Sequence, residues 1–167
     1  MLCELFSRDR ILTGVVCSDR TKLFSVMAEA AGSAYGTDFP FDTAVDALER
    51  REALMSTVIR PFIAIPHAKL AIPGDICGAL AVIPDGVPFV PEKLRDATEL
   101  SGATVRIAFM ILSRHDRPDI HLATLKQLAA LIDFPGFSDA LMRSNDAQEA
   151  YETLRRHENL LRTRRER

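Results

Sequence analysis

Two histidines lie at positions in the sequence where an imidazole could do chemistry. His67 directly follows a short apolar segment, residues 62–65, that predicts a buried strand. Ligands of open α/β sheets bind just beyond the carboxyl ends of strands, and Pro66 stiffens the backbone immediately before this imidazole. His121 lies in the first turn of a predicted helix, where the helix dipole and free N–H groups favour an anion. We therefore expect the two histidines to meet at one edge of the sheet, beside an anion site.

Each histidine in the chain also has a simpler interpretation. A histidine beside a buried strand is often simply a hydrogen-bonded core residue without a chemical role. This alternative stays open for His67. His115 is flanked by arginines and an aspartate and is expected in a solvated loop, whereas His157 is expected on an exposed helix face. His121 is expected to point towards the protein body, because it shares a helix face with Leu125, Leu128 and Ile132.

Metal and nucleotide chemistry find little support in the sequence. A zinc site needs three or four clustered ligands, whereas the chain offers His115 and His121 with scattered cysteines, Cys3, Cys17 and Cys77. No Walker A, G-x-G-x-x-G or G-x-S-x-G motif occurs, and nothing suggests a Ser-His-Asp triad. We therefore expect no metal and no cofactor. An imidazole beside an anion site then indicates phosphoryl relay, in which the imidazole attacks a phosphoryl group activated on a partner protein.

Composition restricts the class of protein. The 167 residues are enough for one domain with a sizeable core, and 47% hydrophobic and 26% charged residues are typical of a soluble globular chain. A net charge of −2 provides no basic field that would hold nucleic acid. The longest apolar run, residues 107–112, is far shorter than the ~18 residues of a membrane span. Charges near the N-terminus argue against a signal peptide, and three widely spaced cysteines predict reduced thiols, as in a cytoplasmic protein.

Strands and helices are expected to alternate along the chain. Apolar runs predict strands over residues 11–16, 62–65, 77–83 and 104–112. Helical periodicity predicts helices over residues 21–32, 41–54, 118–133 and 137–143, and from about residue 146 onward. The helix over 41–54 is expected to place Val45, Leu48 and Ala53 on its inner side, and residues 84–102 are expected to be mostly loop. The fold predicted is a single α/β layered domain with a mixed central sheet flanked by helices.

The C-terminus is expected to change character along its helix. Ala147, Ala150 and Leu154 recur at helical spacing, whereas the last residues are rich in arginine. We expect a helix docked through residue ~154 and a frayed, solvated tail beyond it. The domain is accordingly assigned to residues 1–160 and the basic tail to residues 161–167, with a nucleic-acid-binding or partner-binding arm as the alternative.

Two motifs resemble those of a known family. Residues 51–68 read REALMSTVIRPFIAIPHA, and residues 121–129 read HLATLKQLA. An I-A-I-P-H segment preceded by R-E and S-T, with a downstream H-L pair opening a leucine-rich helix, is similar to the enzyme IIA domain of the phosphoenolpyruvate-dependent sugar phosphotransferase system, in its fructose/mannitol/nitrogen-regulatory class. The resemblance runs from residue 5 to about residue 154. It implies the enzyme IIA fructose/mannitol-type fold and a phosphotransferase that works through a phosphohistidine.

The resemblance also implies roles for individual residues. His67 would accept a phosphoryl group from the carrier HPr, or a nitrogen-branch counterpart, and pass it to an enzyme IIB. His121 would hydrogen-bond the phosphoryl group, and Arg51 would stabilise its charge, although Arg51 beside Arg50 also fits a solvated helix charge. Ser56 and Thr57 match the S-T of the motif and would shape the phosphate loop, or would simply end the helix. The partners implied are HPr, an enzyme IIB and regulatory protein targets, with no nucleic acid and no membrane insertion.

The motif departs from the family pattern at its glycines. Met55, Val58, Arg60 and Phe62 stand where the family has glycine, and Pro61 is an addition. Glycines in such a loop allow positive φ and a close approach of the backbone to phosphate. Their loss predicts an altered loop and altered partner docking. It keeps open the alternative of a regulatory protein that signals by its phosphorylation state without sugar transport.

Overall fold

The centre of the fold is a pair of long apolar strands whose side chains are buried on both faces. The structure, a computed structural model, describes residues 1–89 and 104–165. Strands β5 (Ile76–Pro88) and β6 (Thr104–Ser113) run antiparallel, with Leu80 opposite Phe109. Along β6, Met110 and Leu112 point into one core and the alternate residues Phe109 and Ile111 into the other. Successive side chains of a strand point to opposite faces of the sheet, so one apolar strand contributes residues to the two cores.

Shorter strands complete a mixed sheet around this pair. The order is β1-β5-β6-β3-β2, and β4 also pairs with β6. β1 (Ile11–Leu12) is parallel to β5, and β3 (Ile63–Ala64) and β4 (His67–Lys69) are both parallel to β6. The edge strand β2 (Val58–Arg60) is antiparallel to β3. The predicted mixed central sheet is confirmed.

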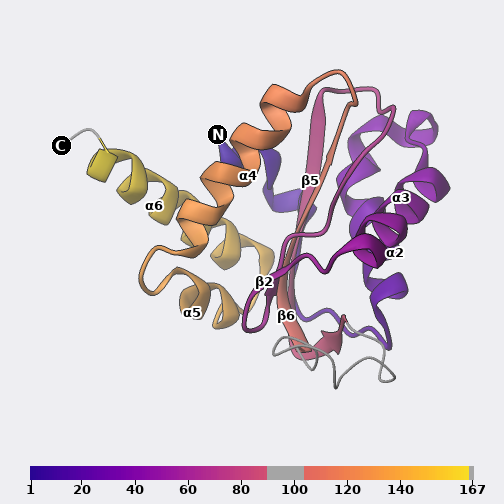
Figure 1. The fold of residues 1–167 in the computed structure, drawn as a ribbon. Helices are drawn as coiled ribbons and strands as arrows, with labels where there is room; N and C mark the ends of the chain where they lie inside the picture. The colour runs from indigo at the N-terminus through magenta and orange to yellow at the C-terminus, as the bar shows by residue number, and fades with distance from the viewer. Residues whose placement is uncertain (90–103, 166–167) are drawn as a thin grey trace.

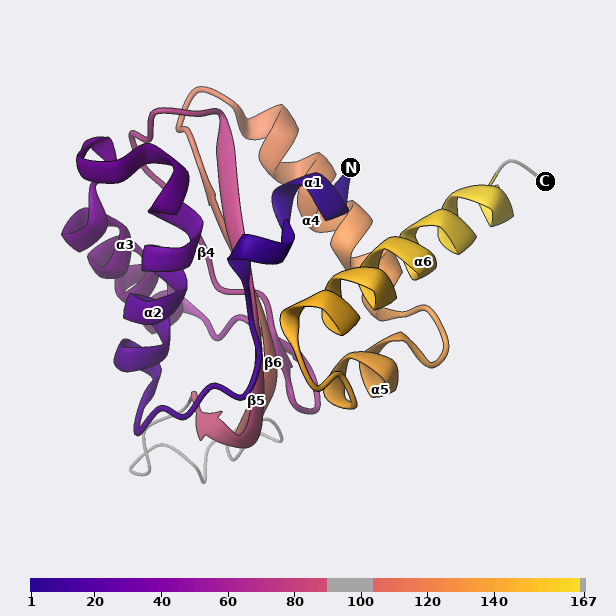
Figure 2. The same cartoon turned by 180° about the vertical axis from the view of Figure 1, so that it is seen from behind.

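Helices cover both faces of the sheet. α2 (Arg20–Gly32) and α3 (Phe41–Leu54) lie on one face, and α4 (Pro118–Ile132), α5 (Phe137–Met142) and α6 (Ala147–Arg165) on the other (Figure 1). The short α1 (Leu2–Leu5) lies beside α4 and α6 (Figure 2). Two 3-10 turns, Arg8–Arg10 and Ser33–Asp38, connect these elements. None of the helices in the described ranges is long and apolar enough to span a membrane.

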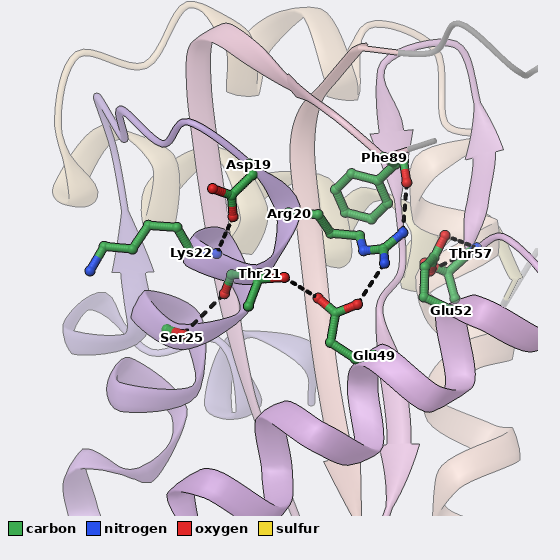
Figure 3. Close-up of polar contacts among 9 residues, drawn as sticks. All are labelled: Asp19, Arg20, Thr21, Lys22, Ser25, Glu49, Glu52, Thr57 and Phe89. Carbon is green, nitrogen blue, oxygen red and sulfur yellow. Dashed lines mark hydrogen bonds and ion pairs between the residues drawn. The ribbon is translucent and has the colours of Figure 1, made fainter. Parts of the chain in front are cut away.

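Polar contacts tie α2 to α3 and to the end of β5. Asp19 caps α2 by accepting a hydrogen bond from the Lys22 amide at 2.8 Å, as its position before the apolar pattern predicts. The Arg20 guanidinium donates to Glu49 on α3 at 2.5 Å and to the carbonyl oxygen of Phe89 at 2.7 Å (Figure 3). The contact between Arg20 and Glu49 fixes the N-terminal end of α2 against α3, the helix that carries the candidate site residue Arg51.

Several predicted strand and loop boundaries are wrong for local reasons. The strand predicted over 11–16 is only Ile11–Leu12, because the chain turns at Gly14 with a φ of 67°. The strand predicted over 62–65 is only Ile63–Ala64, and a separate strand, β4, begins at His67, because Pro66 between them has no N–H to give to a ladder. The predicted loop over 84–102 begins later, because β5 continues to Pro88; residues 90–103 lie outside the described part of the chain.

Helix α3 has the predicted bounds but buries a different set of side chains. Its inner face holds Ala44, Leu48 and Glu52, at offsets of four residues, whereas Val45 is half-buried and Ala53 is exposed. Glu52 therefore lies in the interior, where the apolar pattern did not place it.

The C-terminal helix is longer than predicted. α6 continues without a break to Arg165, so fraying beyond residue 154 is wrong for the described residues. His157, expected on an exposed face, is 7% exposed and packs against the rings of Phe134 and Phe137. Its Nδ1 donates to the Thr153 carbonyl oxygen at 2.8 Å. The division into residues 1–160 and 161–167 stays a prediction.

Candidate functional site

The two candidate histidines lie side by side at one end of the sheet. Their ring centroids are 5.4 Å apart, with an angle of 55° between the ring planes. His67 is the first residue of β4 and lies opposite Ile111 of β6. His121 lies in the first turns of α4, the helix that follows β6. His67 pairs with β6 near its end, and α4 with His121 follows β6, so the expectation that the histidines meet at this edge is confirmed.

The tautomer of His67 is fixed by its own backbone. Its Nδ1 is 2.7 Å from the carbonyl oxygen of Ile65, and a carbonyl oxygen can only accept. Nδ1 therefore carries the proton, and Nε2 keeps a free lone pair. Burial lowers the pKa of His67 below its ordinary value, and the Arg51 cation acts in the same direction, against the raising effect of the bond to Ile65. At pH 7 the ring is neutral and has a nucleophilic nitrogen.

His121 is buried and has one polar partner on the sheet. Its Nδ1 lies 2.7 Å from Oγ of Ser113, the last residue of β6, and the side chain of Ser113 is fully buried. Burial, followed by the neighbouring His67, lowers the pKa of His121 to about 4. His121 is therefore neutral at pH 7 and has a single ring N–H. When Ser113 donates its hydroxyl to Nδ1, that N–H is on Nε2, where it can serve a ligand.

The helix end beside the histidines offers less free backbone than its position suggests. The amide of His121 donates to the carbonyl oxygen of Arg117 at 3.2 Å, so it is not one of the free donors of the first turn. Asp119 adds a carboxylate to the same turn. With Pro118 lacking an N–H as well, the helix end offers an anion few backbone donors, and the side chains of the site supply further favourable charge.

Two adjoining cavities meet at His67. The larger, of about 810 Å³, has both histidines in its wall together with the cations Arg50, Arg51 and Lys69. His115, exposed as expected, also lines it. Among the residues that the structure describes, no carboxylate lines this cavity. The concentration of positive charge around two neutral imidazoles favours an anionic ligand.

Arg51 stands at the junction of the two cavities. It lines both the larger one and a smaller one of about 330 Å³ that also reaches His67. Its Nη1 donates to the carbonyl oxygen of Met55 at 2.8 Å, beyond the end of α3. The Arg51 charge lowers the pKa of both histidines. The structure therefore places Arg51 at the histidine pair.

Ser56 and Thr57 differ in what they can offer a ligand. Thr57 is buried, and both its amide and its hydroxyl donate to the carboxylate of Glu52, the hydroxyl at 2.5 Å (Figure 3). The Thr57 hydroxyl is thus engaged in holding the loop. Ser56 is exposed, lines the smaller cavity and accepts a hydrogen bond from the Val58 amide at 3.3 Å. Both residues line the smaller cavity, and of the pair Ser56 is the one whose side chain is exposed.

Three residues that contribute to the site escaped the sequence analysis. Glu52 holds the loop after α3, Ser113 orients His121, and Lys69 adds a cation two residues after His67. Helical spacing gives a signal for Glu52, which is four residues after the buried Leu48. Ser113 has a weaker signal as the first polar residue after a six-residue apolar run.

Other ligand chemistry has no cluster to support it in the described ranges. No group of three His, Cys, Asp or Glu side chains there could hold a metal ion. Cys3, Cys17 and Cys77 are free thiols, and burial raises the pKa of Cys77 to about 12.

Comparison with known proteins gives this geometry a context. Residues 4–157 match the family described as phosphoenolpyruvate-dependent sugar phosphotransferase system, EIIA 2. A nitrogen regulatory protein of Bradyrhizobium diazoefficiens is 25% identical over 154 residues, covering 92% of this chain and 94% of that protein. A nitrogen regulatory protein of Pseudomonas aeruginosa is 31% identical over 115 residues, covering 69% of this chain and 70% of that protein.

Solved structures share the fold. The nitrogen regulatory protein IIA-Ntr of Neisseria meningitidis superposes with a TM-score of 0.76 at 22% identity, covering 92% of this chain and 98% of that one. The mannitol enzyme IIA of Escherichia coli, in a complex with its phosphorylated enzyme IIB, has a TM-score of 0.68 at 18% identity, covering 88% of this chain and 94% of that one. At these identities the likeness concerns the arrangement of the sheet and helices.

Proposed function

The chain belongs to the EIIA 2 family of the phosphoenolpyruvate-dependent sugar phosphotransferase system, and from this premise we propose that it carries a phosphoryl group on Nε2 of His67. The observation that carries the proposal is the 2.7 Å contact between Nδ1 of His67 and the Ile65 carbonyl oxygen. That contact occupies one ring nitrogen with a proton and leaves the other as a nucleophile that faces a cationic cavity.

The transfer is a displacement at phosphorus. The lone pair on Nε2 of His67 attacks the phosphorus of a phosphohistidine on the donor protein. A new N–P bond forms as the donor's N–P bond breaks, and the departing imidazole keeps the electron pair of that bond. Nδ1 of His67 keeps its proton towards Ile65, which stabilises the charge that the ring gains.

His121 and Arg51 stabilise the transferring group. We assign to His121 the donation of its Nε2 proton to a phosphoryl oxygen, with Ser113 holding the ring in the required tautomer. Arg51 leaves the Met55 carbonyl and donates to the phosphoryl oxygens through its planar fork. Ser56 is a further donor to the group from the smaller cavity. Thr57 contributes by fixing the loop with Glu52.

The partners follow from the direction of the relay. An HPr-type phosphocarrier donates the group and an enzyme IIB accepts it, in the cytoplasm. The complex of the Escherichia coli mannitol enzyme IIA with phosphorylated enzyme IIB supports the second of these partners. The free cysteines are consistent with a reducing compartment.

A regulatory role without sugar transport is the second candidate. It is favoured by the two similar proteins that are named nitrogen regulatory proteins. In this alternative His67 is phosphorylated in the same way, and the phosphorylated and unphosphorylated forms bind other proteins differently. The departures from the glycine pattern around residues 55–62 fit a surface selected for other partners.

One experiment tests the carrier and separates the two roles. Incubation with phosphoenolpyruvate, enzyme I and HPr should give acid-labile phosphate on the wild type and none on His67→Ala. Addition of an enzyme IIB should then discharge the wild type if it is a transport component, and leave it phosphorylated if it is purely regulatory. A wild type that takes no phosphate, or a His67→Ala variant that labels fully, contradicts both roles.

A further inference from the structure

Phe62 has a backbone conformation that its side chain disfavours. Its φ is 69°, and it is the one non-glycine residue with positive φ in the part of the chain that the structure describes. An aromatic residue in the left-handed region is a steric outlier, because its Cβ crowds the backbone. Phe62 therefore stores strain that a glycine would not.

The turn between β2 and β3 explains why this φ is needed. Arg60 pairs with Ile63, so Pro61 and Phe62 are the two central residues of a tight turn. Proline fixes a negative φ at the first of them, and a positive φ at the second then belongs to a type II turn, which favours glycine there. The carbonyl oxygen of Phe62 accepts hydrogen bonds from the amides of Arg106 and Ile107, at 2.8 and 2.9 Å, which hold the turn in this shape.

Among the residues that the structure describes, packing does not compensate for the strain. The Phe62 side chain is 49% exposed and belongs to neither hydrophobic core. A glycine would give the same turn and the same two backbone hydrogen bonds without strain. No core contact in the described part of the chain thus accounts for an aromatic ring at this position, and strained residues cluster at functional sites.

Phe62 is one of four exposed apolar side chains, together called the apolar rim, on the segments that border the histidine site. The rim consists of Leu54 (84% exposed), Met55 (68%), Phe62 (49%) and Leu122 (64%). Leu54 and Leu122 line the larger cavity, and Arg60, two residues before Phe62, lines the smaller one together with His67. Arg60 is tied across the smaller cavity to Asp133 of the α4 end at 2.8 Å. Ile63 lies opposite Ile107 and His67 opposite Ile111, so the Phe62 turn lies about 13 Å along the sheet from His67, at the margin of the cationic centre.

We propose that Phe62 is a docking residue for the protein that donates the phosphoryl group to His67, an assignment that rests on the proposed function. A donor carries an anionic phosphohistidine, which fits the cations Arg50, Arg51 and Lys69, and the surface around that histidine fits the apolar rim. Aromatic side chains, phenylalanine included, are enriched in the buried cores of protein interfaces. Phe62 selects the partner and takes no part in the transfer itself.

The test compares two phosphoryl donors on the full chain. The first donor is phosphorylated HPr, which must dock, and the second is phosphoramidate, which is too small to reach the rim from His67. The variants are Phe62→Gly, which removes ring and strain together, and Phe62→Tyr, which keeps both. Leu160→Ala is the matched control, because Leu160 is similarly exposed (48%) but lies on α6, away from both histidine cavities.

Phe62→Gly should raise the KM for phosphorylated HPr about tenfold and leave kcat nearly unchanged. Its labelling by phosphoramidate and its urea unfolding midpoint should be no lower than those of the wild type. Phe62→Tyr and Leu160→Ala should keep the wild-type KM. A wild-type KM for phosphorylated HPr in Phe62→Gly overturns the proposal. An equal loss of labelling rate with phosphoramidate, or a defect confined to onward transfer to enzyme IIB, also overturns it. A wild type labelled by neither donor instead contradicts the proposed function on which the docking role rests.

Discussion

Nδ1 of His67 donates its hydrogen bond to the carbonyl oxygen of Ile65, only two residues earlier in the chain, at 2.7 Å. The contact is made by the backbone around Pro66, so no other side chain is needed to set the tautomer of the nucleophile. Replacing a neighbouring side chain should therefore change the rate of phosphoryl acceptance without removing the acceptor. The predictions that follow depend on this separation between the nucleophile and the groups that assist it.

His121→Ala should slow phosphorylation of His67 by about a hundredfold or more, as expected when one donor to a developing oxyanion is removed. The final extent of labelling should match that of the wild type, because Nε2 of His67 remains available. Rapid-quench measurement of transfer from phosphorylated HPr gives both numbers. A wild-type rate in this variant would show that His121 is an ordinary buried histidine.

Arg51→Lys should give a rate between those of the wild type and His121→Ala. Lysine keeps a positive charge in the cavity but loses the planar pair of donors that fits phosphoryl oxygens. Arg50→Lys is the matched control, because Arg50 lines only the larger cavity and its neighbour remains intact. If the two lysine variants transfer at equal rates, Arg51 acts only through its charge.

Ser113→Ala should reduce both stability and the rate of transfer. The Ser113 hydroxyl is the buried partner of Nδ1 of His121, and an unpartnered buried polar atom costs about 1–3 kcal/mol. The rate should fall because the His121 proton is no longer directed to Nε2. Urea unfolding and rapid-quench kinetics measure the two effects. Ser25→Ala is the control, because the Ser25 hydroxyl lies on the outer side of α2 and donates only to the Thr21 carbonyl oxygen of its own helix.

The fold should lose stability as the pH falls below 6.5. His121 stays neutral in the folded chain down to a pKa of about 4, whereas in the unfolded chain it binds a proton near pH 6.5. Protonation of His121 in the unfolded chain therefore lowers the free energy of unfolding as the pH falls between these values. The decrease reaches about 3 kcal/mol near pH 4, at about 1.4 kcal/mol per pKa unit. His67, whose pKa is also lowered by burial, adds in the same direction.

The measurement is urea unfolding of the wild type and of His121→Gln at pH 7.5 and pH 4.5. The variant lacks the titrating ring, so its loss of stability between the two values should be clearly smaller. Equal losses in both proteins would show that other groups are responsible for the acid sensitivity.

Local sequence patterns were sufficient to predict those features that do not depend on contacts with distant segments of the chain. The predicted bounds of helix α3 match the observed ones, because helical periodicity is a local signal, although only Leu48 of its predicted inner residues is buried. The meeting of His67 and His121 was also predictable, since both follow strands that end at the same edge of the sheet.

Tertiary contacts explain what the sequence left undetermined. The residues around His157 are charged, which predicts exposure, but α5 and the end of α4 place Phe137 and Phe134 against its ring. The polar Glu52 is buried because the loop after α3 turns back and gives it the Thr57 donors. The positive φ of Phe62 comes from a turn whose usual residue is glycine. Each of these depends on segments that a periodicity analysis treats separately.

The central claim is that Nε2 of His67 is the atom that carries the phosphoryl group. ¹H–¹⁵N correlation NMR of the protein labelled with ¹⁵N-histidine, recorded before and after phosphorylation by phosphoenolpyruvate, enzyme I and HPr, tests it directly. A phosphorus coupling on Nε2 of residue 67, with Nδ1 still protonated towards Ile65, is the result predicted by the 2.7 Å contact. A phosphoryl group on Nδ1 of His67, on His121 or on any other residue would contradict it.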